Sequence, residues 1–433
     1  MAVIIADIMD LSVFKRIILE YQHLTEGIEI VKRDLELDPS LNYVLVGLRR
    51  AGKSFILYQQ MKELLSIGHT REEFLYLNFE DDRLQGLQIA DLDILKQCYE
   101  EMFPHKPIFF LDEIQIIDGW EHFARRLADQ NYRVYITGSN SRMLSKEIAS
   151  TLGGRFMVAN VYPYSFKEHL RAQGITFNDN WLYGPERASI VRQMDIYFYD
   201  GGLPEIEQVT KNLRRSWLSN IYNKIFFGDI VLRYSIRNTM AMKVLMRKLA
   251  ENVKQASTFS RLANIVSSVG TKVRHETIID YLTYIEESCL IFSIENFAAK
   301  VVEKSSSKKY YFADNGLLNI QLIDSNSALL ENLVAIHLHS LYHEDLMFYN
   351  SGIEVDFYLW KPGIAIQAAY SIQNDENTRE REIKALRTLA KKQKLNAMYI
   401  ITYNEREDIQ TDEGMIRVIP IWEWLLSDYL PIS

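Results

Sequence analysis

The chain has 433 residues, enough for about three domains at roughly 150 residues each. Hydrophobic residues make up 48% and charged residues 24%, which is ordinary for a folded globular protein and argues against a mostly disordered chain. The formal net charge of −8 argues against a surface that is basic all over, although a local basic face is compatible with it.

The chain carries neither a disulfide framework nor a membrane signal that we can identify. Two cysteines, Cys98 and Cys289, are too few for such a framework or for a cysteine-based zinc site, so we expect a reducing compartment. No apolar run reaches the ~18 residues that a membrane span needs. The segment Met1–Asp7 lacks the basic start of a signal peptide. We therefore expect a cytoplasmic protein that makes no membrane contact.

The first 150 residues alternate short apolar runs with helical stretches. The runs are β-branched or aromatic and do not alternate with polar residues; they are Tyr43–Val46, Phe74–Leu77, Ile108–Leu111 and Val134–Ile136. Such runs are typical of strands buried on both faces. Strands that alternate with helices predict a parallel α/β sheet.

The pattern changes after Gly201–Pro204 and again near residue 325. Residues 205–290 are mostly helical in pattern, and two β-type runs follow, Leu290–Ile294 and Tyr310–Phe312. The last third predicts a helix, two strands, a charged helix and a strand, over Ala328–Tyr342, Glu354–Trp360, Ile364–Ala369, Asn377–Lys394 and Ala397–Thr402. We therefore predict three domains, over residues 1–200, 201–320 and 321–433.

The strongest motif fits the phosphate-loop pattern G-x-x-x-x-G-K-[ST]. Its glycines let the backbone turn N–H groups toward an anion, its lysine reaches the β- and γ-phosphates, and its serine hydroxyl binds Mg²⁺. An apolar run precedes the motif and the helical stretch Phe55–Leu65 follows it, as a phosphate loop requires. We expect ATP and Mg²⁺ to be bound here, by Gly47, Leu48, Arg49, Arg50, Ala51, Gly52, Lys53, Ser54 and Phe55.

A pair of carboxylates follows the apolar run Ile108–Leu111 directly. They would emerge at the carboxyl end of a buried strand, where α/β folds place their sites. Asp112 is suited to hold Mg²⁺ through water, and Glu113 to act as the general base that polarises the water attacking the γ-phosphate.

Small polar residues and an arginine follow further along the chain. The run Val134–Ile136 ends in Thr137-Gly138-Ser139-Asn140, whose side chains could touch the γ-phosphate or position the attacking water. The alternative for Ser139 or Asn140 is a helix cap. Arg155 follows a glycine pair; a guanidinium suits the charge that develops on a transferring phosphoryl group, and the alternative is a surface ion pair.

The order of these motifs resembles the AAA+ ATPases. Further segments narrow the resemblance; they are Tyr76–Asp81, Leu152–Arg155, Val161–Glu168, Gly201–Pro204, Tyr311–Leu318, Glu331–Asn332 and Glu354–Phe357. The set spans nearly the whole chain and resembles the prokaryotic AAA-family ATPases that end in a C-terminal domain of unknown function. The resemblance implies a P-loop sheet with a helical lid, and the site roles given above.

The resemblance also implies two roles that the residues alone leave open. Ser139 or Asn140 would serve as the sensor of the γ-phosphate. Arg155 would be an arginine finger that acts on the nucleotide of a neighbouring subunit. We therefore expect a homo-oligomeric ring that binds ATP and ADP.

The middle of the chain is basic. Residues 233–282 hold nine Lys or Arg and three acidic residues; the basic residues are Arg233, Arg237, Lys243, Arg247, Lys248, Lys254, Arg261, Lys272 and Arg274. Thr258–Val269, a turn at Gly270 and a helix over Val273–Ser288 predict a helix-turn-helix.

The two β-type runs after this helix pair predict a basic wing that carries Lys300, Lys304, Lys308 and Lys309. A winged helix places its second helix in the major groove while its cations neutralise phosphates. Residues 233–310 are therefore a candidate DNA-binding region. The alternative is a winged helix used for subunit contacts, with its charges solvated.

The C-terminal third is similar to the PD-(D/E)XK nuclease-like fold, with a restriction-endonuclease-like α/β architecture. Glu331 and Asp356 occupy acidic positions, but Gln367 stands at the second acid position and Ala369 at the lysine position. Gln is a poorer ligand for a divalent cation than a carboxylate, and Ala can neither activate water nor stabilise charge. We predict a nuclease fold without nuclease chemistry and without a bound metal.

These features support a leading function and two alternatives. The leading one is an ATP-hydrolysing AAA+ machine whose nucleotide state acts through the later domains, with DNA as a candidate partner. The second is a nucleotide-dependent switch or scaffold that assembles with proteins without DNA. The third is an active ATP-regulated nuclease.

Overall fold

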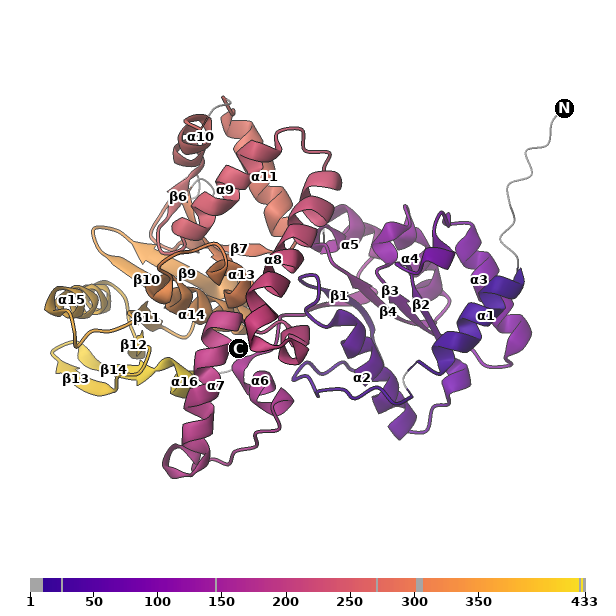
Figure 1. Ribbon diagram of the computed structural model, residues 1–433, viewed down its shortest axis with the longest axis horizontal. Helices are drawn as coiled ribbons and strands as arrows, with labels where there is room; N and C mark the ends of the chain where they lie inside the picture. The colour runs from indigo at the N-terminus through magenta and orange to yellow at the C-terminus, as the bar shows by residue number, and fades with distance from the viewer. Residues whose placement is uncertain are drawn as a thin grey trace. The chain divides into compact units, whose positions relative to one another are not determined.

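The computed structural model describes residues 11–24, 26–144, 146–269, 272–300, 307–427 and 430. The chain divides into two compact units, Met1–Val161 and Tyr162–Ser433 (Figure 1). None of the helices in these ranges is long and apolar enough to cross a membrane.

The first unit is built around a parallel sheet whose described strands lie in the order β2-β3-β4-β1-β5. The strands are β1 (Asn42–Val46), β2 (Phe74–Asn78), β3 (Ile108–Asp112), β4 (Arg133–Gly138) and β5 (Phe156–Asn160). Every residue of β3 is buried, because helices cover both faces of a parallel sheet. The central strands β3, β4 and β1 bring their carboxyl ends to one edge, where the predicted site residues follow.

The helices of the first unit are α1 (Leu11–Gln22), α2 (Lys53–Ser66), α3 (Asp91–Met102), α4 (Trp120–Asp129) and α5 (Lys146–Leu152). Short 3-10 turns lie at Arg71–Glu73, Asp82–Leu84, Ile114–Ile116 and Ser141–Leu144. Helix α4 is strongly amphipathic and buries Trp120, Phe123 and Leu127 in the core. Strand, loop and helix therefore alternate as the sequence predicts.

The second unit contains a mixed sheet with the described order β13-β14-β12-β11-β10-β9-β7-β8-β6. Its strands are β6 (Ser257–Thr258), β7 (Ile291–Asn296), β8 (Ser307–Phe312), β9 (Leu346–Asn350), β10 (Glu354–Leu359), β11 (Ile364–Ala368), β12 (Ala397–Thr402), β13 (Glu407–Thr411) and β14 (Gly414–Pro420). Strands β9, β10 and β11 form an antiparallel meander, whereas β11, β12 and β14 are parallel.

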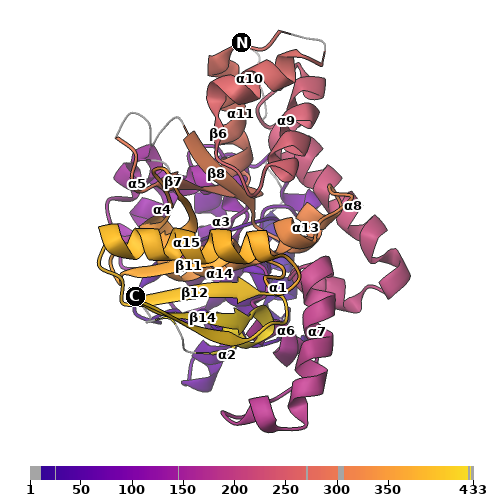
Figure 2. The same cartoon turned by 90° about the vertical axis from the view of Figure 1, so that its left-hand side faces the viewer.

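The helices of the second unit are α6 (Phe166–Ala172), α7 (Glu186–Asp200), α8 (Arg214–Lys224), α9 (Thr239–Glu251), α10 (Phe259–Ser267), α11 (His275–Glu287), α13 (Asn315–Asn319), α14 (Asn326–Tyr342), α15 (Glu376–Lys392) and α16 (Ile421–Trp424). A π-helix over Ile225–Leu232 continues α8, and 3-10 turns lie at Trp181–Tyr183, Pro204–Gln208, Lys211–Leu213 and His343–Asp345. Helix α15 runs alongside the strands, next to β11 (Figure 2), and contacts β10 and β11.

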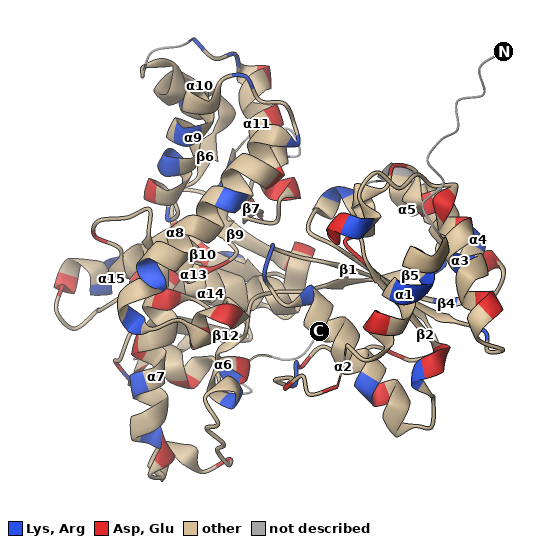
Figure 3. Cartoon of the chain, turned by 45° about the vertical axis from the view of Figure 1, so that its right-hand side comes forward, with Lys and Arg blue, Asp and Glu red and all other residues tan. Residues whose placement is uncertain are grey.

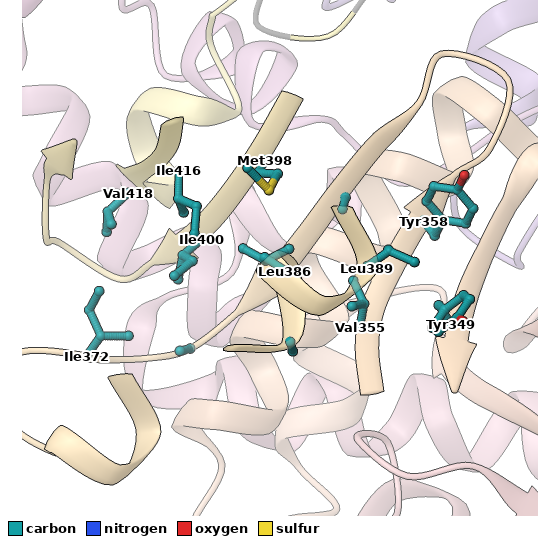
Figure 4. Close-up of a cluster of buried hydrophobic side chains, with 13 residues drawn as sticks. Tyr349, Val355, Tyr358, Ile372, Leu386, Leu389, Met398, Ile400, Ile416 and Val418 are labelled. Carbon is teal, nitrogen blue, oxygen red and sulfur yellow. The ribbon is translucent and has the colours of Figure 1, made fainter. Parts of the chain in front are cut away.

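A hydrophobic cluster holds α15 to this sheet. Leu386 and Leu389 of α15 are fully buried beside Val355 and Ile400 from the strands (Figure 4). Burying side chains of this size stabilises a fold by roughly 1.5–3 kcal/mol each before entropy costs. The part of the chain from α14 to β12 therefore has a well-packed hydrophobic core.

The structure confirms the α/β class and the predicted buried strands, and differs at the sheet edges. Strand β5 was not predicted, because as an edge strand it leaves Met157 and Val158 more than half exposed. Strand β13 lacks an apolar run for the same reason: it is a polar edge strand. Strands β9 and β14 were also missed.

The expected domain boundaries near residues 200 and 320 do not coincide with the two compact units. Helices α6 and α7 belong to the second unit rather than to the phosphate-loop unit. Across the expected boundary near 320, β7 pairs in parallel with β9, so the middle and C-terminal segments share one sheet. Sequence patterns report local structure, and this pairing joins segments about fifty residues apart.

Candidate functional site

The phosphate-loop motif follows β1 and leads directly into α2, which begins at Lys53. Gly52 has φ 94°, a left-handed conformation that favours glycine. At Gly47, a Cβ would stand 2.0 Å from the carbonyl oxygen of Val161, so no other residue fits without moving the backbone. Both glycines of the motif are therefore required by the local geometry.

The side chain of Lys53 is buried within the loop, with 4% of it exposed. Its ammonium donates to the carbonyl oxygens of Gly47 at 3.2 Å and Leu48 at 3.3 Å. It also lies 3.4 Å from a carboxylate oxygen of Glu113. The cation is therefore held at the mouth of the loop beside the expected general base.

Asp112 ends β3 and is 1% exposed. Its carboxylate accepts hydrogen bonds from the hydroxyls of Tyr76, at 2.6 Å, and of Thr137, and it is also bonded to Ser54. Burial raises the pKa of Asp112, and these three hydroxyl donors oppose the rise. The proximity of a carboxylate and the Ser54 hydroxyl fits the oxygen ligands that Mg²⁺ prefers.

Glu113 turns out of the strand with φ 56°, the left-handed region that few non-glycine residues adopt. Its carboxylate accepts from Gln115 Nε2 at 2.5 Å and from the Ser139 N–H at 3.2 Å. Burial raises the pKa of Glu113, but the Lys53 ammonium, followed by the side chains of Gln115 and Ser139, outweighs it, so the pKa lies below its ordinary value. The side chain is therefore a carboxylate at neutral pH, as a general base must be.

Ser139 and Asn140 differ in what their side chains already contact. Ser139 is 1% exposed; its buried hydroxyl lies near enough to Glu113 to help lower the pKa of that carboxyl, but makes no hydrogen bond of ordinary geometry among the described residues. Asn140 accepts a hydrogen bond from the Arg142 N–H at 2.7 Å and so caps the turn that follows β4. The cap alternative therefore describes Asn140, while Ser139 has a hydroxyl available to a phosphate or water.

Arg155 lies at the other end of the sheet from the loop of its own chain. It precedes β5, whose first residue pairs with Asn42 at the start of β1. Five residues of extended strand span roughly 16 Å, so Arg155 cannot reach this loop. Its side chain is partly exposed and forms an ion pair with Asp129 at the end of α4. Any contact with a nucleotide would have to be made on another subunit.

Two site residues were missed by the sequence analysis. Tyr76 lies on β2 beside β3, and Gln115 lies in the 3-10 turn after Glu113. Tyr76 was noted only as part of a family segment. The alternation of side chains along β2 is the signal that points to Tyr76. Asn78 lies opposite Asp112 in the strand register, and Tyr76, two residues earlier, is on the same face of the sheet as Asn78. Phe55, in contrast, is 45% exposed and contacts the ring of Tyr58.

The second unit contains a cavity of about 790 Å³ lined by residues of α14, β10, β11 and α15. Its charged lining includes Glu331, Glu354, Asp356, Arg381 and Glu382. Glu331, Asp356 and Gln367, which the sequence assigns to one nuclease-like motif, all line this cavity. The described His, Cys, Asp and Glu residues form no group of three or more that is arranged to hold a metal ion.

Lys309 occupies the centre of this cluster. Its ammonium is fully buried and lies 3.2 Å from Glu331, 2.8 Å from Glu354 and 3.0 Å from Asp356. The predicted exposed wing is therefore wrong for Lys309. Strand alternation explains the difference: neighbouring Lys308 faces outward and pairs with Glu295 at 3.6 Å.

The glutamine in this cluster is committed to the strands around it. Gln367 is 2% exposed; its carbonyl accepts from the Asp356 N–H at 2.8 Å and its amide donates to the Glu354 carbonyl at 3.0 Å. Burial and the Asp356 charge raise the pKa of Glu331 to about 8 and that of Glu382 to about 7. The cavity therefore binds protons readily near neutral pH.

Two helices, α10 and α11, lie where the helix-turn-helix was predicted, and the predicted turn at Gly270 lies outside the described residues. Thr258 caps α10 by accepting from the Arg261 N–H at 3.2 Å. Strand β6 pairs with β8, and β8 with β7. Cations lie on α9 and around the α10–α11 connection (Figure 3), where Lys272 and Arg274 are exposed. Lys300 is exposed, and the predicted wing residue Lys304 lies outside the described residues.

Residues 40–170 match the AAA domain family, and residues 191–328 match a family described as a domain of unknown function, DUF8612. An uncharacterized protein of Methanocaldococcus jannaschii is 34% identical over 431 residues, which cover 96% of this chain and 95% of that protein. An uncharacterized protein of Haemophilus influenzae is 31% identical over 395 residues, which cover 89% and 94% of the two chains.

Solved structures are more distant. A Walker-type ATPase of Pyrococcus abyssi aligns with 73% of this chain and 97% of its own, at 16% identity and a TM-score of 0.39. The Orc1 protein of Aeropyrum pernix, solved in complex with DNA, aligns with 76% and 96% at 15% identity and a TM-score of 0.33. These TM-scores are too low to support an argument about sites or partners.

Proposed function

The chain belongs to the family of AAA-domain proteins that includes these archaeal and bacterial relatives, and from this membership we propose that it binds ATP with Mg²⁺ and hydrolyses it. The observation that carries the proposal is the meeting of Lys53, Asp112 and Glu113 at the carboxyl ends of β1 and β3. A buried cation, a metal-holding carboxylate and an ionised base are the parts that phosphoryl transfer to water needs.

Each part has a distinct task in the proposed reaction. Lys53 and the loop N–H groups bind the phosphates. Ser54 and Asp112 would hold Mg²⁺, which when bound would supply positive charge to stabilise the phosphates. Glu113 accepts a proton from the attacking water, and the Ser139 hydroxyl is the sensor that contacts the γ-phosphate or this water.

ATP turnover by the wild type and by Lys53→Ala tests this proposal. Lys53→Ala removes a charge-assisted contact worth roughly 1.5–3 kcal/mol, so we expect ATP affinity to fall about tenfold or more and turnover to be lost. Lys62→Ala is the control, because Lys62 lies exposed on the same helix α2 and donates to Ile28 instead. Unchanged turnover in Lys53→Ala would overturn the site assignment.

We further propose that the ATPase unit acts through the second unit, with DNA as the candidate partner. The element order α9–β6–α10–α11–β7–β8 supports a winged helix, and exposed Lys272 and Arg274 precede its second helix. The alternative is a protein scaffold. Two observations favour this alternative. Other cations of the region form ion pairs, Arg247 and Lys248 with Glu251 and Arg233 with Asp229, and Lys309 is buried.

For the C-terminal cavity we propose a nuclease-like site without nuclease activity. Gln367 uses both ends of its amide on β10, and Ala369 offers no polar group. Incubating the protein with DNA and Mg²⁺ or Mn²⁺ tests this proposal, and we expect no cleavage. Cleavage that persists in Lys53→Ala but disappears in Asp356→Ala would contradict it.

A further inference from the structure

We propose that Tyr76 is a positioning residue for Asp112, holding the metal-binding carboxylate in place from the neighbouring strand. This inference rests on the proposed ATPase function and extends it to a residue outside the phosphate loop and the Asp-Glu pair. Its basis is a buried hydroxyl–carboxylate contact between β2 and β3.

Strand register brings the two side chains together. In the parallel pair β2–β3, Asn78 lies opposite Asp112 and Tyr76 lies opposite Phe110. Residues two apart on a strand share a face, so Tyr76 and Asp112 lie on the same side of the sheet. The long tyrosine side chain spans the offset, and its hydroxyl donates to Asp112 Oδ2 at 2.6 Å.

The two oxygens of Asp112 are engaged by different strands. Thr137 of β4 donates to Oδ1, while Tyr76 of β2 donates to Oδ2. Because the donors sit on opposite sides of β3, they fix the rotation of the carboxylate. A carboxylate that cannot rotate presents its remaining lone pairs in one direction. Hydrogen bonds of this kind commonly orient the side chains that bind metals.

Tyr76 is itself held in place by its neighbours. It is 2% exposed, and the rings of Tyr21 and Tyr58 lie 5.1 Å and 5.6 Å from its own. The packed ring therefore fixes the point from which the hydroxyl donates to Asp112.

Losing this donor would affect the metal more than the fold. Tyr76→Phe keeps the ring and its packing but removes the hydroxyl that donates to Asp112 Oδ2. Thr137, on the other side of β3, is then left to hold the carboxylate from a neighbouring strand. A carboxylate that is less firmly oriented binds Mg²⁺ less well.

The experiment compares Tyr76→Phe with Tyr135→Phe. Tyr135 lies fully buried on β4 of the same sheet, and its hydroxyl has no partner among the described residues, so both variants lose one buried hydroxyl. For each protein we would measure ATP turnover against Mg²⁺ concentration. We expect Tyr76→Phe to raise the half-saturating Mg²⁺ about tenfold. We expect Tyr135→Phe to match the wild type.

Two results would overturn the inference while leaving the ATPase function intact. One is a wild-type Mg²⁺ dependence in Tyr76→Phe. The other is an equal change in Tyr135→Phe, which would mean that any lost hydroxyl has this effect. If the wild type binds ATP but turns it over too slowly, the same comparison is made by Mn²⁺ titration with a non-hydrolysable ATP analogue. A wild type that binds neither would overturn the proposed function and this inference with it.

Discussion

The ammonium of Lys53 lies 3.4 Å from the Glu113 carboxylate, and both side chains are largely buried. Each charge therefore offsets the cost of burying the other. The γ-phosphate of ATP carries negative charge that competes with Glu113 for the same ammonium. When ATP binds, the Lys53 ammonium would therefore turn to the phosphate, and the Glu113 carboxylate would become free to contact water. In this way ATP binding would prepare the general base.

We predict that Glu113→Gln binds ATP but hydrolyses it at least ~100-fold more slowly, because an amide cannot accept the proton of the attacking water. Asp112→Asn should instead weaken the Mg²⁺ dependence of binding, since it removes a charged metal ligand. A fluorescent ATP analogue and a phosphate-release assay distinguish the two effects. Identical effects of both variants on binding would contradict the division of roles.

We predict that the protein self-associates and that Arg155 completes the site of a neighbouring subunit. Arg155→Ala should lose turnover, and a mixture with Glu113→Gln should recover part of it, because one kind of hybrid interface contains both groups. Arg126→Ala is the control, since Arg126 forms a comparable exposed ion pair with Asp93 on the same unit. A monomer that retains full turnover after Arg155→Ala would refute the prediction.

The DNA proposal predicts binding that weakens as salt rises, because neutralised phosphates release counterions. Reversing Lys272 and Arg274 to Glu should weaken binding to all sequences alike and should reduce the salt slope by about two. Reversing Lys167 and Lys394, which are exposed elsewhere on the second unit, should change it little. If neither single- nor double-stranded DNA binds at low salt, with or without ATP, the scaffold alternative is favoured.

We predict that Lys309→Met destabilises the second unit by about 3 kcal/mol at neutral pH, because it leaves buried carboxylates without their cation. Urea unfolding measures the loss, which should shrink at acid pH as the carboxylates become neutral. Lys308→Met is the matched control: both Lys308 and its partner Glu295 are partly exposed to solvent, so its loss should stay below ~1 kcal/mol. Equal losses in the two variants would show that Lys309 has no special electrostatic role.

The raised pKa of Glu331 predicts how stability depends on pH. Its value of about 8 in the folded chain exceeds the ordinary 4.5, so the folded state binds the proton more tightly. This contribution to stability is complete below pH 4.5 and is lost as pH rises toward 8. Glu331→Gln, which cannot titrate, should flatten the decline over that window in urea midpoints. An unchanged slope would mean that Glu331 is ionised in the folded chain.

Much of the first unit was predictable because its signals are local. The loop from Gly47 to Ser54 and the Asp112-Glu113 pair each follow an apolar run within a few residues, and the chemistry of the motif specifies the neighbours that it needs. The edge strand β5 gave no such signal, since solvent covers most of its side chains and its composition is free to vary.

The sequence by itself determined the phosphate loop, the buried strands and the α/β class, because backbone conformation and burial leave periodic patterns along the chain. Only the tertiary structure decided which distant groups meet: Tyr76 with Asp112 across two strands, and Lys309 with Glu331 and Asp356 from three separate elements. Such contacts depend on strand order and register, which bring together residues that are twenty or more positions apart. No local pattern encodes that arrangement. Lys309, which the sequence predicts as a residue of an exposed wing, is therefore a buried counterion in the structure.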